Sequence, residues 1–293
     1  MKLFALCKEG RMNVVLRLTV VFIVSLSVSA RETPPQEPEP GDHWESPSGI
    51  VFTWIPGGSF VMGSDAEEVA PDQRPAHSVE LDGFWMSVTE TPNSIYDLFK
   101  KGHSEQTGYV TTSEEPDEPA VMVSWDDAVS FCSWLCQREN LVSGLYDLPT
   151  EAQWERASKG DDNRPYPWGR DIGSEYANVC DMNCAFETIR TYTLDDGYAF
   201  MAPVDSFPAG ASPYGCLNMA GNVREWCKDF YQVEFYRSSP DRNPTGPKKG
   251  TLRVLRGGGF NHPMIDCMTT SREAALPLTS QIDIGFRIIR RPS

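Results

Sequence analysis

The stretch Arg256-Gly257-Gly258-Gly259-Phe260-Asn261-His262 is followed by Cys267 and, close to the C-terminus, by Gly285-Phe286-Arg287. The three glycines do not indicate a phosphate-binding loop, because they lack the lysine and the spacing that such a loop requires. Cys267 is interpreted either as a buried or disulfide-bonded cysteine or as a residue of a metal or redox site. His262 is interpreted either as a hydrogen-bonded loop histidine or as a metal ligand.

Length and charge limit the classes of protein to consider. The chain has 293 residues, enough for a substantial core in one large domain or two small ones. Its formal net charge is −15, from 41 acidic and 26 basic residues. An acidic surface repels phosphate groups, so nucleic acid is not expected as a partner. Carboxylates suit hard cations, which makes calcium a ligand to consider.

The N-terminus has the pattern of an export signal. Basic residues precede the apolar run 18–28, and Val28-Ser29-Ala30 supplies the small residues that signal peptidase accepts. The run is shorter than the roughly 20 residues of a membrane span. We predict a signal peptide over residues 1–30 and no stable membrane span after its cleavage, with an uncleaved anchor as the alternative. The protein is then exported: periplasmic or secreted, or lumenal in a eukaryote.

The rest of the chain divides into a linker and one domain. Residues 31–48 contain five prolines among Glu and Ser, which is typical of an extended linker. Residues 49–293 have short apolar runs, many aromatic residues and frequent Gly and Pro, which predicts one compact domain with much irregular structure.

Local signals predict several elements of this domain. Ser124 can cap a helix that begins at Trp125, and Thr150 with Gln153 forms a capping-box pattern for a second helix. A weaker helix is expected over residues 93–99. Strands are expected over residues 51–55, 253–255 and 286–289. Helices early in the chain and strands late favour an α+β fold.

Seven cysteines lie outside the predicted signal peptide, so at least one lacks an internal partner. Two pairs have four-residue spacing, Cys132 with Cys136 and Cys180 with Cys184. Zinc would require such pairs to converge. In an exported protein, separate disulfides are favoured over zinc.

Ten short motifs follow one another along residues 50–290, and one of them is Asn218-Met219-Ala220-Gly221-Asn222-Val223-Arg224-Glu225-Trp226. They span residues 54–64, 74–79, 90–96, 123–128, 148–155, 167–169, 202–204, 218–226, 256–258 and 285–287. In this order they resemble the sulfatase-modifying-factor family, whose founding member is formylglycine-generating enzyme. The resemblance implies a loop-rich variant of the C-type lectin fold that is stabilised by calcium.

The resemblance also implies two sets of calcium ligands. The first set is Asn178, Val179, Asp196 and Tyr198, and the second is Asn218, Gly221, Val223 and Glu225. In each set, Asn and the acidic residue supply side-chain oxygens and the other two residues supply carbonyl oxygens. Calcium accepts six to eight such hard oxygen ligands. The alternative is that these residues form an ordinary turn and an ordinary hydrogen-bonded loop.

Active members of the family oxidise a cysteine in a Cys-x-Pro-x-Arg segment of a sulfatase to formylglycine, with copper(I) and dioxygen. Two cysteines of the enzyme bind the copper, and the matching positions here are His262 and Cys267. An imidazole can also bind copper, but one thiol cannot replace two soft sulfur ligands. Two further departures lie close by: Gly259 replaces a hydroxyl residue, and Arg224 replaces a tryptophan.

Several functions are therefore compatible with the sequence. The first is an exported oxidase acting on a sulfatase, with its standard activity in question because His262 replaces a catalytic cysteine. The second is a calcium-stabilised, non-catalytic module that binds a peptide, a sulfatase or a glycan. The third is an extracellular structural protein. The expected partner is a sulfatase or another exported polypeptide.

Overall fold

The computed structural model describes residues 33–106, 115–186 and 190–292. The predicted signal peptide lies outside these ranges. Within them, no helix combines the length and the apolar character that a membrane crossing needs. Most strand pairs are antiparallel, and helices do not alternate regularly with strands, which confirms the predicted α+β class.

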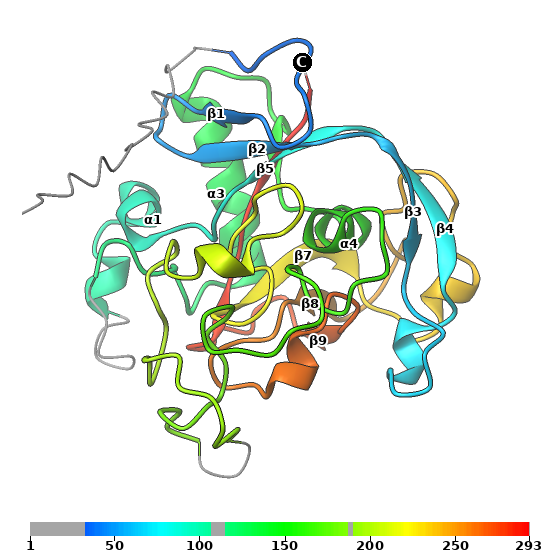
Figure 1. Ribbon diagram of the computed structural model, residues 1–293. Helices are drawn as coiled ribbons and strands as arrows, with labels where there is room; N and C mark the ends of the chain where they lie inside the picture. Colours follow the sequence, from blue (N-terminus) through cyan, green and yellow to red (C-terminus); the bar gives the residue numbers. More distant parts are fainter. Residues whose placement is uncertain (1–32, 107–114, 187–189, 293) are drawn as a thin grey trace, which may run out of the picture.

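A five-stranded antiparallel sheet joins the two ends of the described chain (Figure 1). In spatial order its strands are β1 (His43–Glu45), β2 (Val51–Ile55), β5 (Phe84–Ser87), β11 (Ile289–Arg290) and β6 (Tyr146–Asp147). β2 confirms the strand predicted over residues 51–55. β1 falls within the stretch that composition predicts to be a linker.

A four-stranded sheet carries the segment that opened the sequence analysis. Its order is β10 (Ile284–Gly285), β7 (Arg224–Phe230), β8 (Arg253–Arg256) and β9 (Glu273–Ala275). β10 pairs with β7 in parallel, whereas the other two pairings are antiparallel. β8 confirms the strand predicted over residues 253–255. A separate hairpin consists of β3 (Gly58–Met62) and β4 (His77–Leu81).

The strand predicted over residues 286–289 is wrong in its extent. Phe286 and Ile288 are buried, but they lie in a link between β10 of one sheet and β11 of the other. Arg287 between them is also buried, and its guanidinium binds both carboxylate oxygens of Glu225 at 2.7 Å. The apolar pattern therefore reflects a buried crossing between two sheets, which sequence periodicity does not distinguish from a strand.

All three predicted helices are present: α1 (Asn93–Phe99), α3 (Trp125–Arg138) and α4 (Glu151–Lys159). The Ser124 hydroxyl accepts the Asp127 N–H at the start of α3. At the start of α4, Thr150 and Gln153 form the complete capping box. Single turns of tighter helix are found at Pro71–Gln73, Pro208–Gly210, Phe235–Arg237 and Met264–Cys267.

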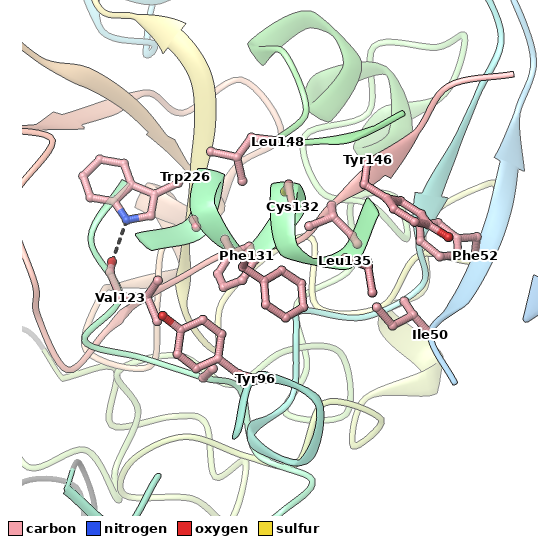
Figure 2. Packing of buried hydrophobic residues seen from close by; sticks show 14 of the residues in the cluster. Ile50, Phe52, Tyr96, Val123, Phe131, Cys132, Leu135, Tyr146, Leu148 and Trp226 are labelled. Atoms are coloured by element: carbon pink, nitrogen blue, oxygen red, sulfur yellow. Dashed lines mark hydrogen bonds between the residues drawn. The ribbon is translucent and has the colours of Figure 1, made fainter. Parts of the chain in front are cut away.

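The largest core cluster lies where α3 packs against both sheets (Figure 2). Phe131 and Leu135 of α3 are fully buried, next to Phe52 of β2 and Trp226 of β7. The indole N–H of Trp226 donates to the Val123 carbonyl at 2.8 Å. Each such buried side chain contributes about 1.5–3 kcal/mol of transfer free energy. The cluster fixes β7, the strand at whose start the candidate site is built.

The stretch between α4 and β7 contains little regular structure in its described part, as Figure 1 shows in green and yellow. It nevertheless includes buried polar side chains such as Asn178 and Asp181. Buried polar groups need partners, and this loop region therefore contains the remaining candidate sites.

Candidate functional site

The glycines after β8 shape the candidate site. Gly257 and Gly258 have φ angles of +96° and +67°, which favour glycine. A Cβ atom at Gly258 would overlap the sulfur of Cys267, so the absence of a side chain there lets the two segments touch. The chain then turns, with the His262 N–H donating to the Gly259 carbonyl at 2.8 Å. After this turn His262 is half-buried, and Cys267, five residues further along the chain, is fully buried.

Cys267 is a buried thiol. Its sulfur lies 3.7 Å from the Pro263 carbonyl oxygen, and it packs in an apolar cluster with Tyr166, Ala220 and Met264. Burial raises the pKa of Cys267 well above its usual value, and the charge of neighbouring carboxylates adds to this effect. The neutral thiol is therefore the stable form, and a neutral thiol is a poor nucleophile.

The ring of His262 faces oxygen atoms on both sides. Nδ1 lies 2.8 Å from Asn261 Oδ1, and Nε2 lies 3.4 Å from Glu273 Oε1. Asp283 Oδ2 is 4.0 Å from Nδ1. A metal ion at His262 would have to displace one of these oxygen atoms from a ring nitrogen. In a neutral imidazole one of these nitrogens carries a proton and can donate to the oxygen atom that it faces, while the other keeps a lone pair.

Arg224 ties this histidine to the four-stranded sheet. Its guanidinium donates to Asp283 at 2.9 Å, to Glu273 at 2.8 Å and to Gln281 at 2.8 Å. Burial alone would raise the pKa of Glu273, but the hydrogen bond from His262 and the charge of Arg224 outweigh it and lower that pKa. Arg224 therefore forms an ion-pair network with Asp283 and Glu273, and the His262 ring contacts this network through Glu273.

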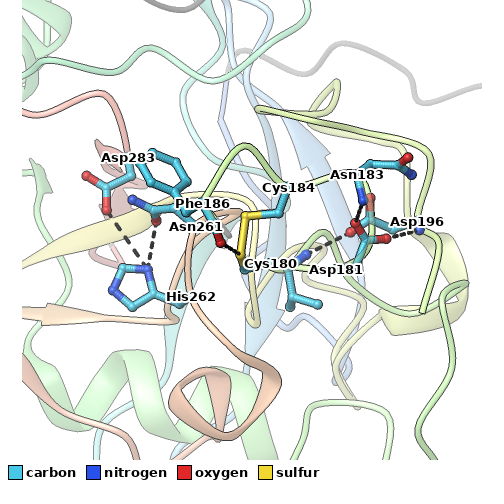
Figure 3. Close-up of a disulfide and its surroundings, with 10 residues drawn as sticks. Cys180, Asp181, Asn183, Cys184, Phe186, Asp196, Asn261, His262 and Asp283 are labelled. Carbon is cyan, nitrogen blue, oxygen red and sulfur yellow. Dashed lines mark hydrogen bonds and ion pairs between the residues drawn. A yellow bond between two sulfur atoms is a disulfide. The ribbon is translucent and has the colours of Figure 1, made fainter. Parts of the chain in front are cut away.

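A groove of about 660 Å³ lies over this network. Figure 3 shows Asp283 and Asn261 beside the ring of His262, with Phe186 and the Cys180–Cys184 disulfide on a neighbouring loop. The residues that line the groove are Met122, Phe186, Arg224, Asn261, His262, Pro263, Asp266, Ser280, Gln281, Ile282 and Asp283. The described lining thus includes His262 but not Cys267.

The two predicted copper residues, His262 and Cys267, are close in sequence but have different surroundings in the structure. The donor set consists of one buried neutral thiol and one imidazole whose nitrogens face oxygen atoms. Copper(I) favours paired soft sulfur ligands, and this set does not fit that preference. Copper at Cys267 and His262 stays a prediction, and we derive no reaction step from it.

The first predicted calcium set, Asn178, Val179, Asp196 and Tyr198, contains a buried oxygen atom that lacks a hydrogen-bond partner among the described residues. This atom is Asn178 Oδ1. Asp196 accepts the N–H groups of Val179 and Tyr198, each at 2.9 Å. Burial raises the pKa of Asp196 to about 7, and the charges of nearby carboxylates oppose its ionisation further. A cation would relieve both conditions, so these residues fit calcium.

The second set has a similar oxygen, Asn218 Oδ1, which is also buried without a hydrogen-bond partner in the described chain. Gly221 has a φ of +79°, and Val223 is fully buried. Glu225, however, is already neutralised by Arg287 and accepts the Trp154 indole N–H at 2.7 Å. The second set therefore fits calcium less well than the first. Calcium at both sets stays a prediction.

Two residues missed by the sequence reasoning connect these sets. Asn222 accepts a hydrogen bond from Asn178 at 3.1 Å and donates to Glu90 at 2.9 Å. Glu90 also accepts from Asn218 at 3.0 Å. Burial, supported by the charge of Glu225 and opposed by that of Arg287, raises the pKa of Glu90 to about 7. Glu90 and Asn222 both lie in motifs of the family, residues 90–96 and 218–226, and these motifs were the sequence signal that could have identified them.

The disulfide prediction is half confirmed. Cys180 and Cys184 form a disulfide. Cys132 and Cys136 do not, so the predicted second disulfide is wrong. Both side chains belong to the core face of α3, where they pack as small apolar groups. The Tyr146 N–H also points at the Cys136 sulfur, at 3.3 Å.

Known proteins give the same fold and family. A model of the sulfatase-modifying factor enzyme 1-like domain matches residues 41–292. The formylglycine-generating enzyme of Bos taurus is 30% identical over 306 aligned residues, covering 85% of this chain and 76% of that protein. The inactive C-alpha-formylglycine-generating enzyme 2 of Mus musculus is 25% identical, covering 80% and 83%. The solved structure of PvdO from Pseudomonas aeruginosa matches with a TM-score of 0.72 at 25% identity, covering 87% of this chain and 100% of that one.

The chain belongs to the sulfatase-modifying-factor family. The matches confirm the resemblance that the motifs indicated. Together with the short helices, mixed sheets and long loops, they confirm the predicted C-type-lectin-like fold.

Proposed function

We propose that this protein is exported and binds a polypeptide, a sulfatase or another exported chain, in the groove over Arg224 and His262. We further propose that it does not form formylglycine by the two-thiol copper reaction. The observation that carries the proposal is the contact of the His262 ring with Glu273 and Asn261. At the position that the resemblance matches to a copper-binding cysteine, this chain has a ring held among oxygen atoms.

The groove itself supports polypeptide binding. It combines apolar walls at Phe186 and Ile282 with charged groups at Arg224 and Asp266, so it can receive both apolar and polar side chains. Family members named formylglycine-generating enzyme support a sulfatase as the partner. The apolar N-terminal run supports export.

A second candidate function is oxidation of a bound cysteine through Cys267 alone. The retained thiol at this position favours it. The reaction would require the buried thiol to become exposed and ionised, and burial opposes both changes. This candidate is therefore weaker than binding.

A labelled peptide with a Cys-x-Pro-x-Arg sequence tests the proposal. We expect it to bind to the mature protein, as measured by fluorescence anisotropy, and to keep its mass after incubation with copper(I) and air. Ser280→Trp should block the groove, whereas Ser133→Trp on the exposed face of α3 should not weaken binding. Equal binding by both variants would exclude the groove. Conversion of the peptide, with the bovine enzyme as positive control, would establish the second candidate instead.

A further inference from the structure

We propose that the Cys180–Cys184 disulfide is a redox-sensitive lock on the groove, and that its reduction releases one groove wall. The inference concerns the same groove as the proposed function. It can be tested without a ligand, because its first readout is the protection of backbone amides.

The lock touches the candidate site directly. The N–H of Cys180 donates to the carbonyl oxygen of His262 at 2.8 Å. His262 in turn donates its own N–H to Gly259 at 2.8 Å. The backbone of His262 is therefore held from two sides, by its own turn and by the disulfide-bonded loop.

The disulfide-bonded loop comprises residues 180–186, and its Cys180 end is anchored by hydrogen bonds. Asp181 is fully buried, and its carboxylate accepts the N–H groups of Asn183 and Asp196. The Cys180 carbonyl accepts the Thr191 N–H at 2.9 Å. Cys180 is thus fixed by contacts that do not depend on the disulfide.

The position of the other end, from Cys184 to Phe186, depends more strongly on the disulfide. The Cys184 N–H makes a long 3.3 Å hydrogen bond to the Asp181 carbonyl, and Phe186 follows two residues later as part of the groove lining. The Phe186 ring is 38% exposed and lies 6.4 Å from the ring of Phe260, so its packing is partial. The disulfide therefore transmits the rigidity of Cys180 to Phe186 across the loop.

A dithiol reductant can open this lock. It supplies two electrons and two protons, the bond between the sulfurs of Cys180 and Cys184 breaks, two thiols form, and the reductant closes into its own disulfide. Met182, at 48% exposure, brings the loop to solvent although both cysteines are buried. The other cysteines in the described ranges are free thiols, so reduction there acts on a single bond.

Hydrogen exchange followed by mass spectrometry tests the lock on the intact mature protein. After reduction with a dithiol, amides of residues 183–186 should exchange about tenfold faster, because local opening becomes easier. Amides of residues 259–263 should change much less, because Cys180 holds them through contacts that do not depend on the disulfide. Segments in α3 should not change. Unchanged exchange in residues 183–186, with the disulfide shown by mass to be reduced, would overturn the proposal.

Two variants separate the lock from a general loss of structure. Cys180→Ala/Cys184→Ala should show the fast exchange without reductant and no response to it. In the anisotropy assay, Phe186→Ala should weaken peptide binding several-fold, and reduction should then have little further effect. A reduction effect as large in Phe186→Ala as in the wild type would show that Phe186 is not the wall that the disulfide holds. A peptide that does not bind at all would contradict the proposed function, while the exchange experiment would still test the lock.

Discussion

Arg224 and His262 share one carboxylate: Glu273 accepts a hydrogen bond from Arg224 at 2.8 Å through Oε2, and its Oε1 lies 3.4 Å from His262 Nε2. The two positions at which the motifs predict departures from the family pattern therefore belong to one network.

Breaking this network should have a measurable electrostatic effect. Arg224→Gln removes a cation from Glu273 and Asp283, so the pKa of Glu273 should rise, which carboxyl NMR can measure. The free energy of unfolding should fall by about 2 kcal/mol, because Asp283 is left buried with a weaker partner. An unchanged Glu273 titration would show that Arg224 does not control this carboxylate.

A second network, deep in the protein, should dominate stability. Arg256 and Glu155 form a fully buried ion pair at 2.6 Å, and Lys159 contacts the same carboxylate at 2.7 Å. Arg256→Met should lower the free energy of unfolding by about 3–5 kcal/mol, since Glu155 keeps only Lys159 as a cationic partner and the buried Thr269 carbonyl loses its donor. The exposed Arg242, which pairs with Glu80, is the matched control. Arg242→Met should lower the free energy of unfolding, measured by urea denaturation, by at most about 1 kcal/mol. Equal losses of stability in the two variants would show that burial does not decide how much these ion pairs contribute.

Stability should also depend on pH through Asp229. Burial, with the charge of Glu151, raises the pKa of Asp229 from 3.8 to about 8. Between these values the folded state binds a proton that the unfolded state releases. This contribution to stability is complete below the unfolded pKa and is lost as the pH rises through about 8.

Asp229→Asn removes this titration but keeps an oxygen that can accept the Glu151 N–H. Wild-type protein should therefore lose stability relative to the variant as the pH rises from about 5 to about 8. Chemical denaturation at several pH values measures the difference. Parallel curves for the two proteins would show that Asp229 keeps an ordinary pKa when folded.

Calcium should stabilise the protein through the first predicted ligand set. At a concentration 100 times its dissociation constant, a ligand that binds only the folded state adds about 2.7 kcal/mol. Calcium should raise the melting temperature of the wild type, and chelation should lower it. Asp196→Asn should reduce the shift, whereas exposed Asp195→Asn should retain most of it. Equal shifts in both variants would place calcium elsewhere.

Local chemistry made much of the fold predictable. The caps at Ser124 and Thr150 depend on residues within one helical turn, so both helix starts were found from sequence. The crossing at Phe286–Ile288 was not, because its burial comes from two sheets that meet only in the folded protein. The free thiols of Cys132 and Cys136 were not predicted either, because the spacing of two cysteines on one helix does not show whether they are joined.

The candidate site was predictable only in part. The motifs predicted that His262, Cys267 and Arg224 belong to the candidate site, and the structure places His262 and Arg224, but not Cys267, in the groove lining. Glu273 begins β9 and Asp283 immediately precedes β10, and only the sheet order places them beside Arg224 at the start of β7. Their role depends on this arrangement rather than on any local spacing.

A competitive copper(I) titration tests the central claim most directly. The account predicts that the mature protein binds copper(I) weakly, that Cys267→Ser leaves this weak binding unchanged, and that His262→Cys strengthens it by supplying a second sulfur. Tight binding of one copper(I) ion by the wild type that disappears in Cys267→Ser would contradict the account.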